Sequence, residues 1–143
     1  MYQRFIAVGR LGRDPETATT PAGVRVATLR LATSEYVKGE ERTEWHRVVV
    51  WDDKLIDVIE RRAKRGSLVA VEGQVRTRRW HKEGREVFTT EIVLDRFNSR
   101  LQILANARSQ GEIEDLFRHA ETRAANNGDA HRAESVADEE IPF

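Results

Sequence analysis

The chain has 143 residues, enough for one domain and a terminal extension, and 39% of them are hydrophobic while 34% are charged. Cysteine is absent, which excludes disulfides and thiol chemistry, and no apolar run approaches the roughly 18 residues that span a bilayer, so we expect a cytoplasmic protein. The net charge of zero is the sum of a basic segment and an acidic one. Residues 1–105 hold 20 Lys and Arg against 15 Asp and Glu, whereas residues 106–143 hold 4 Arg against 9 Asp and Glu. A basic body with an acidic tail indicates a domain that binds a polyanion and a tail that interacts with other proteins.

Five stretches of alternating or apolar residues predict β-strands. The first ends where Gly12 and the Asp14-Pro15 pair follow, because proline cannot continue a ladder of hydrogen bonds. Residues 17–23 are expected to form a loop, and residues 95–100 a kink or bulge within the last strand. The predicted strands are residues 4–11, 24–34, 44–51, 68–80 and 87–103.

One helix is predicted between the third and fourth strands. Asp52 or Asp53 is a suitable N-cap, because a side-chain oxygen at that position accepts a free backbone N–H. The helix is expected to reach about Arg65, and Gly66 has the residue type that favours the position just after a helix end. Its apolar stripe, at helical spacing, consists of Leu55, Ile56, Ile59 and Ala63.

The order of three strands, one helix and two strands suits a small closed barrel. Long strands with a single helix favour a barrel over a sandwich. Five strands with the helix after the third are the arrangement of the OB-fold, which binds oligonucleotides on one curved face. We therefore predict an all-β OB-fold barrel with one helix over residues 1–105, followed by a flexible acidic C-terminal tail.

The three tryptophans indicate what this barrel binds. In a strand, every second side chain lies on the same face. Flat rings stack on unpaired bases and arginines pair with phosphates, so a face that alternates the two is typical of a surface for single-stranded nucleic acid. A core strand would not place arginines between its tryptophans. The two alternating sets are Trp45, Arg47, Val49 and Trp51, and Gln74, Arg76, Arg78 and Trp80.

Several segments, in the same order, resemble the bacterial single-stranded DNA-binding protein (SSB) family. The resemblance covers residues 1 to about 105 and then the last six residues. The matching segments are residues 8–16 (VGRLGRDPE), 31–35 (LATSE), 43–49 (TEWHRVV), 64–69 (KRGSLV), 71–80 (VEGQVRTRRW) and 141–143 (IPF).

This resemblance implies an OB-fold that assembles as a homotetramer and wraps single-stranded DNA without sequence preference, at the nucleoid, during replication, recombination and repair. It implies base stacking on Trp45, Trp51 and Trp80, and it implies no cofactor. Relatives often carry a further tryptophan at the position of Val37, so the adjacent Tyr36 is a candidate for the missing stacking platform.

Basic side chains near the aromatic residues are candidates for phosphate contacts, because Lys and Arg neutralise the nucleic-acid backbone. An arginine on an exposed strand is often only a solubilising residue. For Arg76 and Arg78, the alternation with Trp80 favours a binding role. The further candidates are Arg10, Arg13, Arg30, Arg47, Lys54 and Arg79.

The C-terminal segment differs in character from the barrel. Residues 106–137 are expected to form a flexible linker, because they cannot bury enough apolar surface to offset the entropy of ordering. Within them, residues 112–125 have helical spacing of apolar residues and are where a short helix can form. Three acids followed by exposed apolar residues predict docking onto replication, recombination and repair proteins. This tip consists of Asp138, Glu139, Glu140, Ile141, Pro142 and Phe143.

Other classes of protein fit the sequence less well. No metal site is expected, because cysteine is absent and no pair of histidines has the spacing of zinc ligands. An enzyme is not expected, because the sequence has neither a Ser/His/Asp order nor a GxxxxGK[ST] phosphate loop. The alternatives are a phage-borne or recombination-specific SSB and an accessory OB-fold module of the primosome, which would not need the acidic tip.

Overall fold

The computed structural model describes residues 1–106, 115, 118–123 and 125. The chain divides into two compact units, Met1–Ala107 and Arg108–Phe143. The elements of the first unit are β1 (Phe5–Leu11), β2 (Glu16–Thr19), β3 (Arg25–Val37), β4 (Glu40–Val50), α1 (Asp53–Arg62), β5 (Leu68–Lys82), β6 (Arg85–Leu94) and β7 (Arg100–Ala105).

In the second unit, residues 115, 118–123 and 125 are helical, and they fall inside the segment where the sequence allows a short helix. The rest of that segment, most of the predicted linker and the whole acidic tip lie outside the described residues.

Five of the strands close into a barrel, as predicted for an OB-fold. The hydrogen-bonded order is β1-β3-β4-β6-β5, and β1 also pairs with β5, which closes the ring. All of these pairs are antiparallel except β4 with β6. β2 and β7 lie outside the ring, where β2 pairs with β3 and β7 pairs with β5.

The barrel interior is filled by the alternating apolar residues of its strands. Because side chains point to opposite faces in turn, each strand that follows this pattern gives one row of residues to the core and one to the outside. Burial of these rows is the main stabilising contribution to the domain. The largest fully buried side chains on the strands are Leu29, Leu31, Val48, Val50, Val69, Val71 and Leu94.

Helix α1 covers one end of the barrel. Asp52 is its N-cap, and the carboxylate of Asp52 accepts the N–H of Lys54 at 2.8 Å. Ile56 and Ile59 are fully buried beneath the helix. The predicted end at Arg65 is wrong, because the helix stops at Arg62 with Ala63 as its C-cap.

Gly66 lies in a tight turn beyond the helix and is not the residue after its C-cap. Its φ of +87° is in the left-handed region that favours glycine. Its N–H donates to the carbonyl of Leu11 at 2.7 Å, and the N–H of Ser67 donates to the carbonyl of Lys64 at 3.0 Å. These bonds turn the chain from α1 into β5 and fix that corner against β1.

Two other boundaries differ from the prediction. Part of the expected loop at residues 17–23 belongs to β2, whose exposed polar residues give no apolar signal, although they pair with β3. The last predicted strand, residues 87–103, is two strands, β6 and β7. The predicted kink is a full break there, because the segment between them leaves the ladder and turns at Asn98, which has a φ of +59°.

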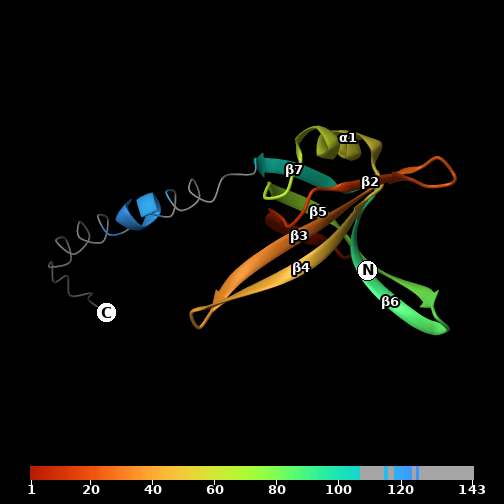
Figure 1. The fold of residues 1–143 in the computed structure, drawn as a ribbon, viewed down its shortest axis with the longest axis horizontal. Helices are drawn as coiled ribbons and strands as arrows, with labels where there is room; N and C mark the ends of the chain where they lie inside the picture. Colours follow the sequence, from red (N-terminus) through yellow and green to blue (C-terminus); the bar gives the residue numbers. More distant parts are fainter. Residues whose placement is uncertain (107–114, 116–117, 124, 126–143) are drawn as a thin grey trace, which may run out of the picture. The chain divides into compact units, whose positions relative to one another are not determined.

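Two hairpins extend beyond the barrel as arms. The β3–β4 arm turns at Lys38 and Gly39, and the β5–β6 arm turns at Glu83 and Gly84, all with positive φ. Two successive residues with positive φ are typical of a tight two-residue hairpin turn whose twist matches the strands. Figure 1 shows both arms leaving the barrel on the side away from α1.

Candidate nucleic-acid interface

The outer face of β4 carries the first alternating set predicted from the sequence. Trp45 and Arg47 lie on this face, and their partners across the β3–β4 ladder are Ala32 and Arg30. Directly opposed residues share a face of the sheet, so Arg30 joins Arg47 there. Trp45 is 56% exposed, which leaves aromatic surface open to solvent beside two guanidinium groups.

The ring of Trp45 packs on the backbone of Gly12, in the segment that follows β1. A Cβ atom at position 12 would lie 2.6 Å from Cη2 of Trp45, so any side chain there would displace the ring. The N–H of Gly12 donates to the carbonyl of Arg30 at 2.9 Å, which fixes the glycine against β3. Gly12 therefore leaves the space that the indole ring of Trp45 occupies, a role that the sequence analysis did not assign.

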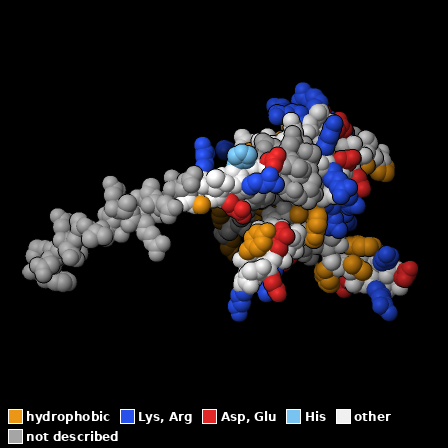
Figure 2. All heavy atoms as spheres, turned by 60° about the vertical axis from the view of Figure 1, so that its left-hand side comes forward, with side chains coloured by type: hydrophobic (Ala, Val, Ile, Leu, Met, Phe, Trp, Pro, Cys, Tyr) orange, Lys and Arg blue, Asp and Glu red, His pale blue; other side chains and the backbone are white. Residues whose placement is uncertain are grey.

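The second alternating set lies on β5, where it continues into the β5–β6 arm. Residues two apart in β5 share a face, so this set lies together on the outer side of the sheet. Figure 2 shows Lys and Arg side chains beside exposed hydrophobic side chains on the arms. The set and its partners on β6 are Gln74 opposite Val93, Arg76 opposite Glu91, Arg78 opposite Thr89 and Trp80 opposite Val87.

Glu91 joins the two alternating sets. Its side chain is only 9% exposed, and its Oε1 accepts Nε of Arg47 at 3.1 Å and Nε of Arg78 at 2.9 Å. A buried carboxylate needs such partners, because desolvation without them is costly. A guanidinium has five N–H donors, so a bond through Nε leaves the terminal amino groups for other acceptors. The signal that the sequence analysis missed is an acid, Glu91, directly before the buried apolar run of residues 92–94 at the end of β6.

Trp80 is also held by β6. Its indole Nε1–H donates to Oγ1 of Thr89 at 2.8 Å. Thr89 and Glu91 lie two residues apart on the same face of β6, so this strand orients both a tryptophan and two arginines. The aromatic and basic side chains therefore approach a ligand from a fixed framework.

Tyr36 and Arg10 lie near this surface in different ways. Tyr36 lies four residues beyond Ala32 in β3, so the two share a face of the strand. Because Ala32 pairs with Trp45, Tyr36 is on the same face as Trp45, and it is 76% exposed. Arg10 pairs with Ala32 across the β1–β3 ladder, and its Nη1 donates to the carbonyl of Gly66 at 2.8 Å. Tyr36 is thus free to stack, whereas Arg10 is partly engaged with the backbone.

Three other predicted basic residues do not belong to the two alternating sets. Arg13 is in the turn after β1, 3.8 Å from Glu16. Arg79 is on the opposite face of β5 from Arg78 and Trp80, and its Nη1 lies 2.9 Å from Glu86. Lys54 is an exposed residue in the first turn of α1. None of the three is a member of the two alternating sets, although Arg13 directly follows Gly12, on which the ring of Trp45 packs.

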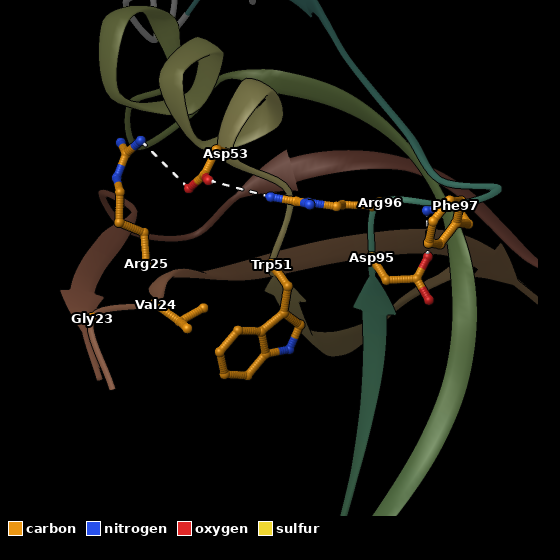
Figure 3. Close-up of a pocket in the computed structure, with 8 residues that line it drawn as sticks. All are labelled: Gly23, Val24, Arg25, Trp51, Asp53, Asp95, Arg96 and Phe97. Atoms are coloured by element: carbon orange, nitrogen blue, oxygen red, sulfur yellow. Dashed lines mark hydrogen bonds and ion pairs between the residues drawn. The ribbon is translucent and has the colours of Figure 1, made fainter. Parts of the chain in front are cut away.

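Trp51 stands where the parallel strands β4 and β6 end. Its backbone N–H donates to the carbonyl of Leu94 at 2.8 Å, and the residue is 39% exposed. β4 ends at Val50, so Trp51 is the first residue after the strand. The alternation of faces within β4 therefore does not determine the side on which Trp51 lies. Trp51 instead lines an open hollow of about 560 Å³, shown in Figure 3.

Arg25 borders this hollow and ties β3 to α1. Its guanidinium donates to Asp57 and Glu60, each at 3.0 Å, and lies 3.8 Å from Asp53. The hydrogen bond to Asp57 is the largest cause that raises the pKa of Arg25 above its ordinary value, so the group stays protonated. Three carboxylates offset its charge, which leaves Arg25 poorly suited to attract a phosphate.

His46 has a structural environment. Its Nε2 is 2.8 Å from Oγ1 of Thr33, and its ring lies 5.2 Å from that of Phe5. Among the described residues, no group of three or more His, Cys, Asp or Glu is arranged to hold a metal ion. None of the helices in the described ranges is long and apolar enough to cross a membrane.

Known proteins resemble this chain along most of its length. The model of the single-strand binding protein family matches residues 2–100. A single-stranded DNA-binding protein of Rickettsia conorii is 40% identical over 151 residues, which cover 98% of this chain and 96% of the relative. One from Rhizobium meliloti is 41% identical over 115 residues, or 76% of this chain and 66% of the relative.

A solved structure agrees with these relatives. The Plasmodium falciparum SSB in complex with ssDNA superimposes with a TM-score of 0.69 and 32% sequence identity, covering 73% of this chain and 96% of that one. The fold, the two alternating sets, the family model and the relatives lead to one conclusion. This chain belongs to the single-strand binding protein family.

Proposed function

We propose that the protein binds single-stranded DNA without sequence preference, on the face that carries Trp45, Arg47, Arg78 and Trp80. The observation that carries this proposal is the joining of the two aromatic and basic sets by one buried carboxylate, Glu91. Membership of the family supports it, as do relatives that are named for binding single-stranded DNA and a structural neighbour solved with ssDNA.

The proposed mechanism is passive. Every base has a π-face that can stack on an indole, and every nucleotide has a phosphate that can pair with an arginine, so binding tolerates any sequence. A duplex keeps its bases stacked inside and cannot offer them to Trp45 and Trp80. Binding therefore holds a strand open without nucleotide hydrolysis or any other chemical step.

The experiment that tests this function is intrinsic tryptophan fluorescence during titration with oligo-dT, at low and high salt, with duplex DNA of equal length as the control. Strong quenching by the single strand alone is the expected result, weaker at high salt because phosphate binding releases counterions. An equal response to duplex would mean that the tryptophans are structural, and the proposal would fail.

We also propose that the chain assembles with copies of itself, as a tetramer according to the family resemblance. An apolar patch on the outer face of the β1–β5–β7 sheet supports self-association: Ile6 is 69%, Val8 52% and Leu104 51% exposed. Clustered exposed apolar residues of this kind are typical of protein interfaces. Light scattering should give a lower mass for Val8→Lys, whereas Val24→Lys, at a 47% exposed valine outside the patch, should leave the mass unchanged.

A second proposal concerns the acidic tip, Asp138 to Phe143, which lies outside the described residues. We propose that it recruits replication, recombination and repair proteins at the nucleoid, where the barrel holds its DNA. Three acids can steer the tip toward a basic rim, while Phe143 enters a pocket. Phe143→Ala should abolish partner binding and leave oligo-dT affinity unchanged, and a loss of both would contradict a separate docking role.

A further inference from the structure

The hollow beside Trp51 is formed by three segments that are distant in sequence. They are the turn between β2 and β3, the end of β4 with the start of α1, and the connection between β6 and β7. Figure 3 shows the indole of Trp51 between Val24 and Asp95, with Arg96 reaching across to Asp53. The lining residues are Gly23, Val24, Arg25, Trp51, Asp53, Asp95, Arg96 and Phe97.

Three apolar side chains of this hollow are open to solvent. Trp51 is 39%, Val24 47% and Phe97 75% exposed. Large apolar side chains that gather at a concave surface mark a place where another molecule binds. Two of the three are aromatic, and aromatic rings are what a base requires for stacking.

Phe97 is exposed on a well-fixed turn. Its N–H donates to Oδ1 of Asp95 at 3.0 Å, and the N–H of Asp95 donates to Oγ of Ser99 at 3.0 Å. Asn98 follows with a φ of +59°, a conformation that asparagine tolerates better than most residues. The turn thus holds a phenylalanine in water, which costs free energy that ligand contact would recover.

The charges around the hollow are paired with one another. Arg25 lies 3.8 Å and Arg96 4.0 Å from Asp53, while Asp95 lies 3.6 Å from Arg76. Because Arg25 and Arg96 share Asp53 and Asp95 has Arg76 as its partner, these four lining groups attract a free phosphate or a cation only weakly. They do offer hydrogen-bond donors and acceptors at the rim, which suits a flat, uncharged, polar ring such as a nucleobase.

The hollow is continuous with the proposed DNA-binding face. Arg76 belongs to the alternating set on β5 and reaches Asp95 in the hollow. Trp51 follows directly on β4, which carries Trp45 and Arg47. A strand of DNA that runs along these two sets is therefore delivered to the hollow when it passes the ends of β4 and β6.

We propose that this hollow is a nucleobase subsite, in which one base stacks on Trp51 and a neighbouring base stacks on Phe97. This inference rests on the proposed function and adds Phe97 to the surface as a stacking residue. Phe97 contributes contact to bases and not to phosphates. Its removal should therefore weaken binding without changing the number of counterions released.

The test compares Phe97→Ala with Phe88→Ala in the full chain. Phe88 is a matched control, because it is 64% exposed and lies opposite Arg79, on the other face of the β5–β6 arm. We expect Phe97→Ala to weaken oligo-dT binding roughly tenfold or more, the loss of one base stack, with an unchanged slope of log affinity against log salt. Phe88→Ala should bind as the parent does, and Phe97→Tyr should restore binding.

The outcomes separate the two proposals. If the parent chain binds oligo-dT with tryptophan quenching and Phe97→Ala binds equally well, the subsite is wrong and the proposed function stands. If Phe97→Tyr fails to restore the affinity that Phe97→Ala loses, stacking is not the role of Phe97, and the subsite is again overturned. If the parent chain does not bind oligo-dT, both proposals fail together.

Discussion

Arg47 on β4 and Arg78 on β5 donate to the same carboxylate oxygen of Glu91, although β4 and β5 are not neighbours in the sheet. Strand β6 lies between them and supplies the acid. The two guanidiniums are thereby held at a fixed separation on one surface. Glu91 offsets one of their two positive charges, so the unit keeps a net positive charge toward a phosphate backbone.

Replacing Glu91 by glutamine should destabilise the fold. We expect Glu91→Gln to lower the free energy of unfolding by about 1–2 kcal/mol, because two arginines lose their common anion. The loss is smaller than for a fully buried pair, since the arginine side chains are 37% and 56% exposed. Urea unfolding followed by circular dichroism measures it. Glu86→Gln breaks the exposed pair with Arg79 and should change the free energy of unfolding by less than about 0.5 kcal/mol. Equal losses in the two variants would show that Glu91 stabilises the fold no more than an exposed carboxylate does.

A methyl group at Gly12 should impair DNA binding through Trp45. The Cβ of Gly12→Ala would overlap the indole ring of Trp45 and displace it from its position against the backbone of Gly12. We expect a loss of affinity for oligo-dT of up to about 1–3 kcal/mol, the range for one base–aromatic stack. Fluorescence titrations of Gly12→Ala, Trp45→Ala and the double variant form a cycle. The Gly12→Ala effect should vanish when Trp45 is absent, and an undiminished effect would show that Gly12 acts through another contact.

The local parts of the site could be predicted from the sequence. Trp45 with Arg47, and Arg78 with Trp80, share faces because the strand period of two is a property of the backbone itself. The start of α1 was also accessible, since capping depends on neighbouring residues: the sequence indicated Asp52 or Asp53 as the N-cap, and it is Asp52. The closed barrel followed from the order of strands and helix.

The relations between strands could not be predicted in the same way. Glu91 contacts Arg47 and Arg78 across two ladders, and no spacing along the chain encodes that meeting. Gly12 reaches Trp45 only once β1, β3 and β4 have paired. β2 was missed because its residues are exposed and polar, and the arms were predicted too short because strands beyond the core bury no alternating row.

Arginines on the two faces of β5 should differ in their effect on salt dependence. Arg76→Gln removes one phosphate contact from the proposed DNA-binding face, so the slope of log affinity against log salt should become shallower by roughly 0.7, the value per contact for a single strand. Arg79→Gln removes the same charge from the opposite face and should leave the slope unchanged. Equal changes in both variants would indicate that only the net charge of the protein matters.

Trp80 should contribute by stacking, and Thr89 by orienting it. Trp80→Ala is expected to cost about 1–3 kcal/mol of binding free energy, the usual range for one stacked base. Thr89→Val keeps the shape of the side chain but removes the acceptor of the indole N–H, so it should cost at most about 1 kcal/mol, the worth of one hydrogen bond. Titration of each variant with oligo-dT measures both losses, and in the Trp80→Ala background Thr89→Val should have no further effect. A cost of Thr89→Val that persists without the indole would place Thr89 in direct contact with DNA.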